Sequence, residues 1–225
     1  DDDAQLIEKN TLKKAITIIE SDISIGQLGG VQQNNEGEIQ TYGAISGWDG
    51  FLDRKKSSLS FNGQLRAKGL HIPTSFCLMN TKLFFDVGGF DPIYYFYDED
   101  VDLSLRVTNK GYDCVVEREI NYKHQSGSSI RTRNRRYFNK SYLIFKNSSL
   151  IKNILYLIVT FLNIFNFRSL NTFDDNLLKF KITFDLFFNL KNISNRRNKI
   201  FLNDNEMIEN NQILSKLNHF EAKDF

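Results

Sequence analysis

The chain has 225 residues, of which 41% are hydrophobic and 25% charged, a composition typical of one large globular domain or of one domain with an appendage. Its net charge of +2 excludes a strongly basic nucleic-acid-binding protein, although basic residues gather at 131–136 and at Arg196-Arg197. The two cysteines, Cys77 and Cys114, have no metal-ligand spacing and suit a reducing compartment.

The first part of the chain alternates helical and extended patterns. Apolar residues at helical spacing predict a helix over 6–20. The segment 25–32 predicts a strand whose glycines allow close backbone approach, and 39–45 can return as its hairpin partner. The polar segment 47–69 predicts a loop.

Capping and stop residues define the next elements. A buried strand is expected over 74–80, and Asn80 can cap a short helix that ends at Gly88-Gly89. A second helix is expected over 99–109, with Gly111 as its left-handed stop.

The pattern changes along the last third of the chain. A strand over 113–124 and a helix over 135–146 complete an α/β arrangement, and from Leu150 only helical patterns follow. We therefore predict two domains, 1–149 and 150–225.

An acidic cluster begins the 99–109 helix. Asp98, Glu99, Asp100 and Asp102 all lie in or next to its first turn, where the helix dipole favours anions. Asp98 fits an N-cap, and Asp102 fits an ion pair with Arg106 four residues later.

Asp100 differs from the other three carboxylates. Its helical neighbours are Leu103, Ser104 and Val107, so it shares a face with apolar residues and has no local cation. A carboxylate turned towards the packed side is costly, which makes Asp100 a candidate general base in a cleft, with helix capping as the equally weighted alternative.

The stretch GGFDPIYYFYDEDVDLSLRVTNKGYDCVVEREINYKHQSGSS, residues 88–129, resembles the C-terminal half of the catalytic domain of family 2 glycosyltransferases. The motifs that carry the resemblance are Gly-Gly-Phe-Asp at 88–91, an aromatic run, the acidic helix start, Gly111-Tyr112 and a strand ending at His124. They are most similar to rhamnosyltransferase-like members that build bacterial surface polysaccharides. The resemblance covers about residues 1–150.

The resemblance implies a partial GT-A sheet that lacks its N-terminal strands, followed by an all-α segment. It implies transfer of a sugar, with rhamnose as the expected sugar, from a nucleotide diphosphate sugar to a glycan or lipid-linked acceptor with inversion. Glu99-Asp100 corresponds to the family's Glu-Asp pair, and Asp100 to its base.

The resemblance also implies a divalent cation, Mg²⁺ or Mn²⁺, to neutralise the leaving diphosphate. Asp3 would hold it, Asp1 would contact the ribose or the metal's water shell, and His124 would contact the metal or the diphosphate. The alternative for His124 is a surface or hydrogen-bonded residue.

Five residues are candidate contacts of the nucleotide sugar or the acceptor: Asp2, Trp48, Phe96, Tyr97 and Asp98. Trp48 can stack on a sugar face or anchor its loop. Phe96 and Tyr97 can line the acceptor pocket or simply pack.

The C-terminal segment combines apolar faces with lysines. Residues 150–167 are nearly apolar, but the uninterrupted run 154–159 is shorter than the ~20 residues of a membrane-spanning helix. The segments 150–167 and 177–192 together predict helices lying in a membrane interface. The alternatives are packing on the catalytic domain and a homodimer face.

These observations predict a fragment of an inverting, metal-dependent glycosyltransferase, peripheral on the cytoplasmic face of a bacterial membrane, that is inactive without its N-terminal half and binds no nucleic acid. Two other classes stay open. One is a non-catalytic, membrane-associated scaffold, and the other is a metal-dependent hydrolase that uses Asp100 and His124.

Overall fold

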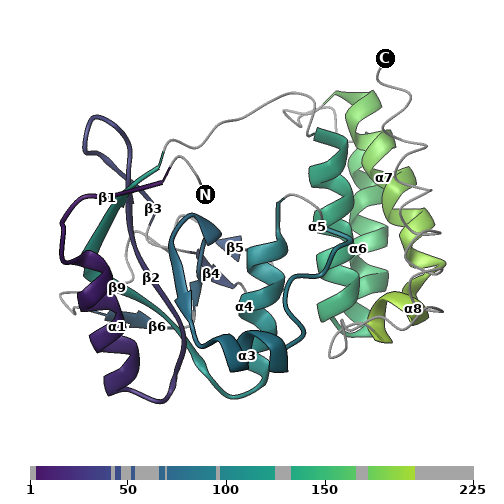
Figure 1. Ribbon diagram of the computed structural model, residues 1–225. Helices are drawn as coiled ribbons and strands as arrows, with labels where there is room; N and C mark the ends of the chain where they lie inside the picture. The colour runs from purple at the N-terminus through teal and green to yellow at the C-terminus, as the bar shows by residue number, and fades with distance from the viewer. Residues whose placement is uncertain are drawn as a thin grey trace. The chain divides into compact units, whose positions relative to one another are not determined.

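The computed structural model describes residues 4–41, 44–46, 52–53, 66–68, 70–94, 97–124, 133–165 and 172–195. These residues form a mixed α/β structure (Figure 1). They divide into two compact units, one built from the described parts of 1–90 and 99–127, the other from those of 91–98 and 128–225.

The first unit contains a six-stranded sheet, a small three-stranded sheet, and three α-helices among its described residues. The helices are α1 (Thr11–Ser21), α3 (Thr81–Asp86) and α4 (Glu99–Asn109). The strands are β1 (Gln5–Leu6), β2 (Ile25–Gln33), β3 (Ile39–Thr41), β4 (Ala44–Ser46), β5 (Leu52–Asp53), β6 (Arg66–Lys68), β7 (Leu70–His71), β8 (Cys77–Met79) and β9 (Asp113–Lys123).

The larger sheet is centred on the parallel pair β2 and β9. Since a strand has only two edges, β1 and β6 share the outer edge of β9, and β3 and β8 share the outer edge of β2. All four of these shorter strands are antiparallel to the strand they pair with. The small sheet has the order β5-β4-β7.

Helices cover both faces of the large sheet. Side chains alternate along β9, so that it contributes apolar residues to both faces. Cys114 and Val116 join an apolar cluster with α3 and α4, whereas Val115 and Ile120 join a second cluster with α1. The glycines of β2 allow the close approach that the sequence predicted. A Cβ at Gly26 would lie 2.5 Å from a methyl carbon of Val107 on α4.

Several predicted boundaries are confirmed. The Asn80 side chain caps α3 by accepting hydrogen bonds from the backbone N–H groups of Lys82 and Leu83. Gly88 and Gly89 follow with φ of 91° and 66°. Helix α4 spans the predicted 99–109, and Gly111 stops it with φ of 94°.

The prediction for the N-terminal helix is partly wrong. Helix α1 begins only at Thr11, and Gln5–Leu6 instead forms β1, paired with Tyr122 and Lys123. The open edge of β9 offers hydrogen-bond partners that the local helical pattern cannot reveal.

The extended segments also differ in part from prediction. Thr74–Phe76 is a single 3₁₀ turn after Pro73, so that only Cys77–Met79 pairs with β2. Ile39–Thr41 returns along β2 as predicted, but Ala44–Ser46 belongs to the small sheet. Within 47–69, predicted as loop, the described residues include β5 and β6.

The second unit is helical in its described part. Its elements are α5 (Arg133–Asn147), α6 (Leu150–Leu162), the 3₁₀ turn η3 (Asn163–Phe165), α7 (Phe173–Phe187) and α8 (Leu190–Asn195). Helix α7 packs against α5 and α6, and α8 packs against α5 (Figure 1). The predicted domain division at Leu150 follows the change in sequence pattern and stays a prediction.

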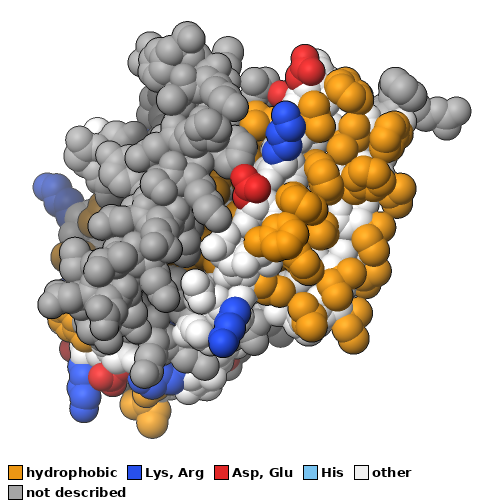
Figure 2. Space-filling view, turned by 90° about the vertical axis from the view of Figure 1, so that its right-hand side faces the viewer, with side chains coloured by type: hydrophobic (Ala, Val, Ile, Leu, Met, Phe, Trp, Pro, Cys, Tyr) orange, Lys and Arg blue, Asp and Glu red, His pale blue; other side chains and the backbone are white. Residues whose placement is uncertain are grey.

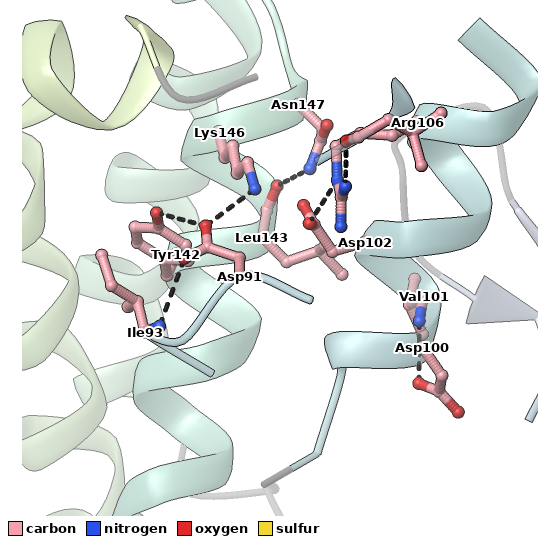
Figure 3. A network of polar contacts seen from close by, with 11 residues as sticks. Asp91, Ile93, Asp100, Val101, Asp102, Arg106, Tyr142, Leu143, Lys146 and Asn147 are labelled. Atoms are coloured by element: carbon pink, nitrogen blue, oxygen red, sulfur yellow. Dashed lines mark hydrogen bonds and ion pairs between the residues drawn. The ribbon is translucent and has the colours of Figure 1, made fainter. Parts of the chain in front are cut away.

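A short segment before α4 is anchored to α5 within this unit. Lys146 Nζ lies 2.9 Å from Asp91 Oδ2, with both side chains fully buried, and the Tyr142 hydroxyl donates to the same oxygen at 3.0 Å (Figure 3). Arg135 donates to the carbonyl oxygens of Ile93 and Tyr94. Asp91, the last residue of the Gly-Gly-Phe-Asp motif, therefore has a structural role here.

Among the described helices, none is long and apolar enough to cross a membrane.

Candidate functional site

The first turn of α4 presents its carboxylates to different surroundings. Figure 3 shows Asp102 turned towards Arg106, whereas the Asp100 side chain points away from that pair. Asp100 and Asp102 therefore have different neighbours.

Asp102 has the structural role that its spacing predicted. Arg106 Nε donates to Asp102 Oδ2 at 2.9 Å, and the side chains are 3% and 0% exposed. Arg106 Nη1 also donates to the carbonyl of Val87 at the end of α3. The pair ties α3 to α4 inside the unit, so Asp102 is not a candidate for chemistry.

Asp100 lies beside a histidine that sequence reasoning missed. His71 Nε2 is 3.7 Å from Asp100 Oδ2, and the side chains are 11% and 18% exposed. This distance suits an ion pair when the imidazole is protonated but is too long for a good hydrogen bond. The other carboxylate oxygen of Asp100 accepts from the backbone N–H of Val101 at 2.7 Å.

The position of His71 depends on a contact between β7 and α4. The backbone N–H of Ile72 donates to Ser104 Oγ at 3.1 Å, inside the buried core. Ser104 is one turn after Asp100 on α4. This bond therefore holds the end of β7 against α4 and keeps the imidazole near the carboxylate.

Buried polar groups lie near enough for the charge of Asp100 to act on them. Burial raises the pKa of Tyr122 to about 12; Asp100 acts in the same direction, and the hydrogen bond with Ser75, 2.9 Å long, acts against it. Burial likewise raises the pKa of Cys77 to about 12, with Cys114 and Asp100 adding to the effect. Tyr122 and Cys77 are thus neutral around physiological pH.

The backbone directly before α4 is strained. Tyr97 and Asp98 have φ of 70° and 64°, a left-handed conformation that costs non-glycine residues about 1–3 kcal/mol each. Asn139 Nδ2 donates to the Tyr97 carbonyl at 2.7 Å, and Arg136 lies 4.4 Å from the centre of the Tyr97 ring. Such strain is typical of functional sites.

These contacts bear on two predicted roles. Asp98 directly precedes α4, as predicted for an N-cap, but its left-handed φ departs from the extended backbone usual at that position. The ring of Tyr97 contacts Arg136, in line with the packed alternative. Acceptor contacts by Tyr97 and Asp98 stay predictions.

His124 follows β9, where β2 and β9 both end. Its backbone N–H donates to the Gln33 carbonyl at 3.0 Å. The Gln32 amide nitrogen donates to the His124 carbonyl at 3.0 Å and lies 3.1 Å from Nδ1. The bond from the Gln32 amide to the His124 carbonyl fixes which end of the amide faces the ring. Nδ1 of His124 therefore accepts a hydrogen bond from the Gln32 NH₂ group.

This arrangement is the hydrogen-bonded alternative for His124. A metal-bound histidine usually donates its second ring N–H to an acceptor, the reverse of what Gln32 offers Nδ1. In the described part of the chain, no group of three or more His, Cys, Asp and Glu side chains could hold a metal. A metal role for His124 would require the Gln32 amide to turn and ligands from elsewhere.

Of the other predicted site residues, Glu99 is the first residue of α4, and five lie outside the described residues: Asp1, Asp2, Asp3, Trp48 and Phe96. The chain enters the sheet where Gln5 pairs with Lys123, the neighbour of His124. The metal-binding role of Asp1 and Asp3 stays a prediction.

No family model matches this chain, and no curated protein matches it. The resemblance to family 2 glycosyltransferases therefore rests on the motif residues alone.

Proposed function

We propose that the chain is part of an inverting glycosyltransferase in which Asp100 is the general base. The observation that carries the proposal is the placement of Asp100 beside His71 in the first turn of α4, while Asp102 is already engaged with Arg106. The motif resemblance over 88–129 supports the same residue.

In this proposal the acceptor hydroxyl attacks the anomeric carbon of a nucleotide diphosphate sugar, with rhamnose as the expected sugar. The bond from that carbon to the diphosphate oxygen breaks, and the nucleotide diphosphate leaves with the electron pair. The acceptor proton passes to Asp100. The helix N-terminus favours the carboxylate form before the transfer.

His71 is the positioning residue of this site. A protonated imidazole at 3.7 Å orients the carboxylate and stabilises its charge; a neutral one leaves it a stronger base. The described residues supply no ligand set for Mg²⁺ or Mn²⁺, so no step is assigned to the metal. We also propose that the first unit is the C-terminal part of a GT-A domain acting on a glycan or lipid-linked acceptor.

The test uses the full-length product of the gene that encodes this chain. Release of nucleotide diphosphate is measured with nucleotide sugars, with and without acceptor glycans. We expect Asp100→Asn to lower kcat about 10²- to 10⁴-fold, the usual contribution of general base catalysis. The matched control Asp86→Asn, an exposed carboxylate of the same unit, leaves kcat unchanged.

Three results would contradict the proposal. Full activity of the Asp100→Asn variant would show that Asp100 is not the general base. Sugar release into water without acceptor would indicate a hydrolase. Absence of turnover with every donor, together with an unchanged function of the Asp100→Asn protein in cells, would indicate a scaffold.

A further inference from the structure

Helix α6 buries its polar side and exposes its apolar side. Its buried residues are Asn153, Tyr156 and Thr160, three polar side chains at helical spacing. Its outward positions carry large apolar side chains, of which Ile151 is 72% exposed. The exposed set includes Ile151, Ile154, Leu155, Ile158, Val159 and Leu162. A helix on the surface of a water-soluble domain places these two kinds of residue the other way round.

The interior of the second unit accounts for the buried polar residues. The Tyr156 hydroxyl lies 3.2 Å from Ser141 Oγ, which is itself 3.0 Å from Thr183 Oγ1 on α7. Asn153 donates to the carbonyl of Phe145 on α5 at 3.3 Å. These bonds fix the rotation of α6, so its apolar side faces outwards as a consequence of the packing.

The exposed apolar surface continues onto α7. A row of phenylalanine rings, with neighbouring centres 4.9–5.7 Å apart, runs through Phe165, Phe161, Phe180, Phe184 and Phe188. The contact between Phe161 and Phe180 joins α6 to α7. Figure 2 shows the hydrophobic side chains gathered on this side of the second unit. We call the exposed residues of α6 and this row the apolar face.

The chemistry of the apolar face favours lipid over a protein partner. Protein interfaces carry about one hydrogen bond per 100–200 Å² and a polar rim. Between Ile154 and Leu162, the outward positions of α6 have no polar side chain. Acyl chains need no directional partner, and this stretch offers none.

Length and charge define how such a helix meets a bilayer. Helix α6 has 13 residues and is therefore about 20 Å long, too short for a hydrocarbon core of about 30 Å. Apart from the buried Lys146, Arg135 and Asp91, the described residues of the second unit include seven Lys and Arg against four Asp, an excess that favours anionic headgroups. Exposed charges of both signs occur on α6 and α7, Lys152 and Lys181 against Asp174 and Asp185, so apolar contact dominates.

We propose that the apolar face docks on a lipid bilayer, with α6 and α7 lying flat in the interface between headgroups and acyl chains. This inference rests on the rotation of α6 and not on the glycosyltransferase proposal. It would hold for a scaffold as well as for an enzyme.

The test is flotation of the full 225-residue chain with vesicles of phosphatidylcholine alone and with added phosphatidylglycerol. We expect the protein to float with both, and more with the anionic vesicles. The variant with both Leu155→Asp and Ile158→Asp should bind at least about tenfold more weakly, because two charges would enter the interface. The milder pair Leu155→Ala and Ile158→Ala, which removes apolar area without adding charge, should bind more weakly than the unaltered chain and more tightly than the Asp pair.

The control places the same charges elsewhere. Leu12→Asp with Ile23→Asp, both exposed in the first unit, should float like the unaltered chain. Circular dichroism confirms that each variant keeps its helices.

Several results would overturn the proposal. A concentration-dependent dimer that Leu155→Asp and Ile158→Asp disrupt, without flotation, would mean that a second copy covers the face. A monomer that does not float would mean that the face is covered within the chain. Flotation only with anionic vesicles and only at low salt would assign binding to the basic residues.

Discussion

At the residue scale, two carboxylates two positions apart on α4 have different surroundings because their side chains leave the helix in different directions. Asp102 enters the core and forms a buried ion pair with Arg106. Asp100 lies at the partly exposed end beside His71. The helix dipole favours the charged form of both carboxylates alike. The difference between them therefore comes from neighbours on other elements.

The buried pair makes a specific stability prediction. Arg106→Met should lower the free energy of unfolding by about 3–5 kcal/mol, because it leaves the Asp102 charge buried without its guanidinium. The double variant Asp102→Leu with Arg106→Met should recover most of that loss. Urea unfolding measures both, and Lys110→Met, at an exposed residue near the end of α4, is the control. A loss by the double variant equal to that of Arg106→Met would contradict this account.

At the element scale, β2 passes unusually close to β9. The pairing jumps from Gly29 with Val116 to Val31 with Asn121, so β9 bulges opposite Gly30. A Cβ at Gly30 would lie 2.5 Å from the Ile120 carbonyl oxygen. The bulge brings the Ile120 backbone against β2, and only glycine leaves room for it.

Gly30→Ala should therefore destabilise the first unit by about 1–3 kcal/mol or more, since a backbone carbonyl cannot move aside as a flexible side chain can. The matched control is Ile23→Ala, at a side chain 91% exposed, with an expected change within about 0.5 kcal/mol. Chemical unfolding monitored by circular dichroism compares the two. Equal stability of the two variants would mean that β9 can shift to make room for the Cβ.

At the scale of the whole molecule, both units contain a buried tyrosine whose pKa is raised. Burial raises the pKa of Tyr122 in the first unit and of Tyr156 in the second to about 12. In the first unit, burial also raises the pKa of Cys77 to about 12 and that of Cys114 to about 11.

These shifts predict alkaline sensitivity. The pKa of each group is higher in the folded than in the unfolded protein. Its contribution to the free energy of unfolding is therefore complete below the unfolded pKa and is lost as the pH rises to the folded pKa. The first unit should lose stability between about pH 9 and 12 and the second between about pH 10 and 12, by roughly 2–3 kcal/mol per tyrosine. Burial lowers the pKa of Lys179 from its ordinary 10.5, so the effect of this lysine is a rise in stability with pH that ends near the start of the tyrosine window.

Urea unfolding at a series of pH values tests this prediction, with tyrosinate absorbance read in parallel. Tyr122→Phe should reduce the alkaline loss of the first unit only, leaving the part due to Cys77 and Cys114. Tyr156→Phe should reduce the loss of the second unit only. Titration of all nine tyrosines near the ordinary value in the folded protein would contradict it.

Local signals in the sequence determined the limits of α3 and α4, the ion pair of Asp102 with Arg106, and the closeness of the β2 glycines to their neighbours. Caps, glycine stops and i, i+4 spacing act within a few residues, so a single stretch of chain specifies them. Helix geometry also indicated Asp100 as a candidate base, with helix capping as the equal alternative, and the family resemblance indicated the same residue.

Only the tertiary structure decided the contacts between distant residues. His71 and Asp100, and Asp91 and Lys146, are far apart in the chain, and no local pattern relates them. The apolar residues of α6 were visible in the sequence, but periodicity shows that a helix has two faces and not which one is buried. Hydrogen bonds of Tyr156 and Asn153 with α5 decided that, by turning the polar side of α6 inwards.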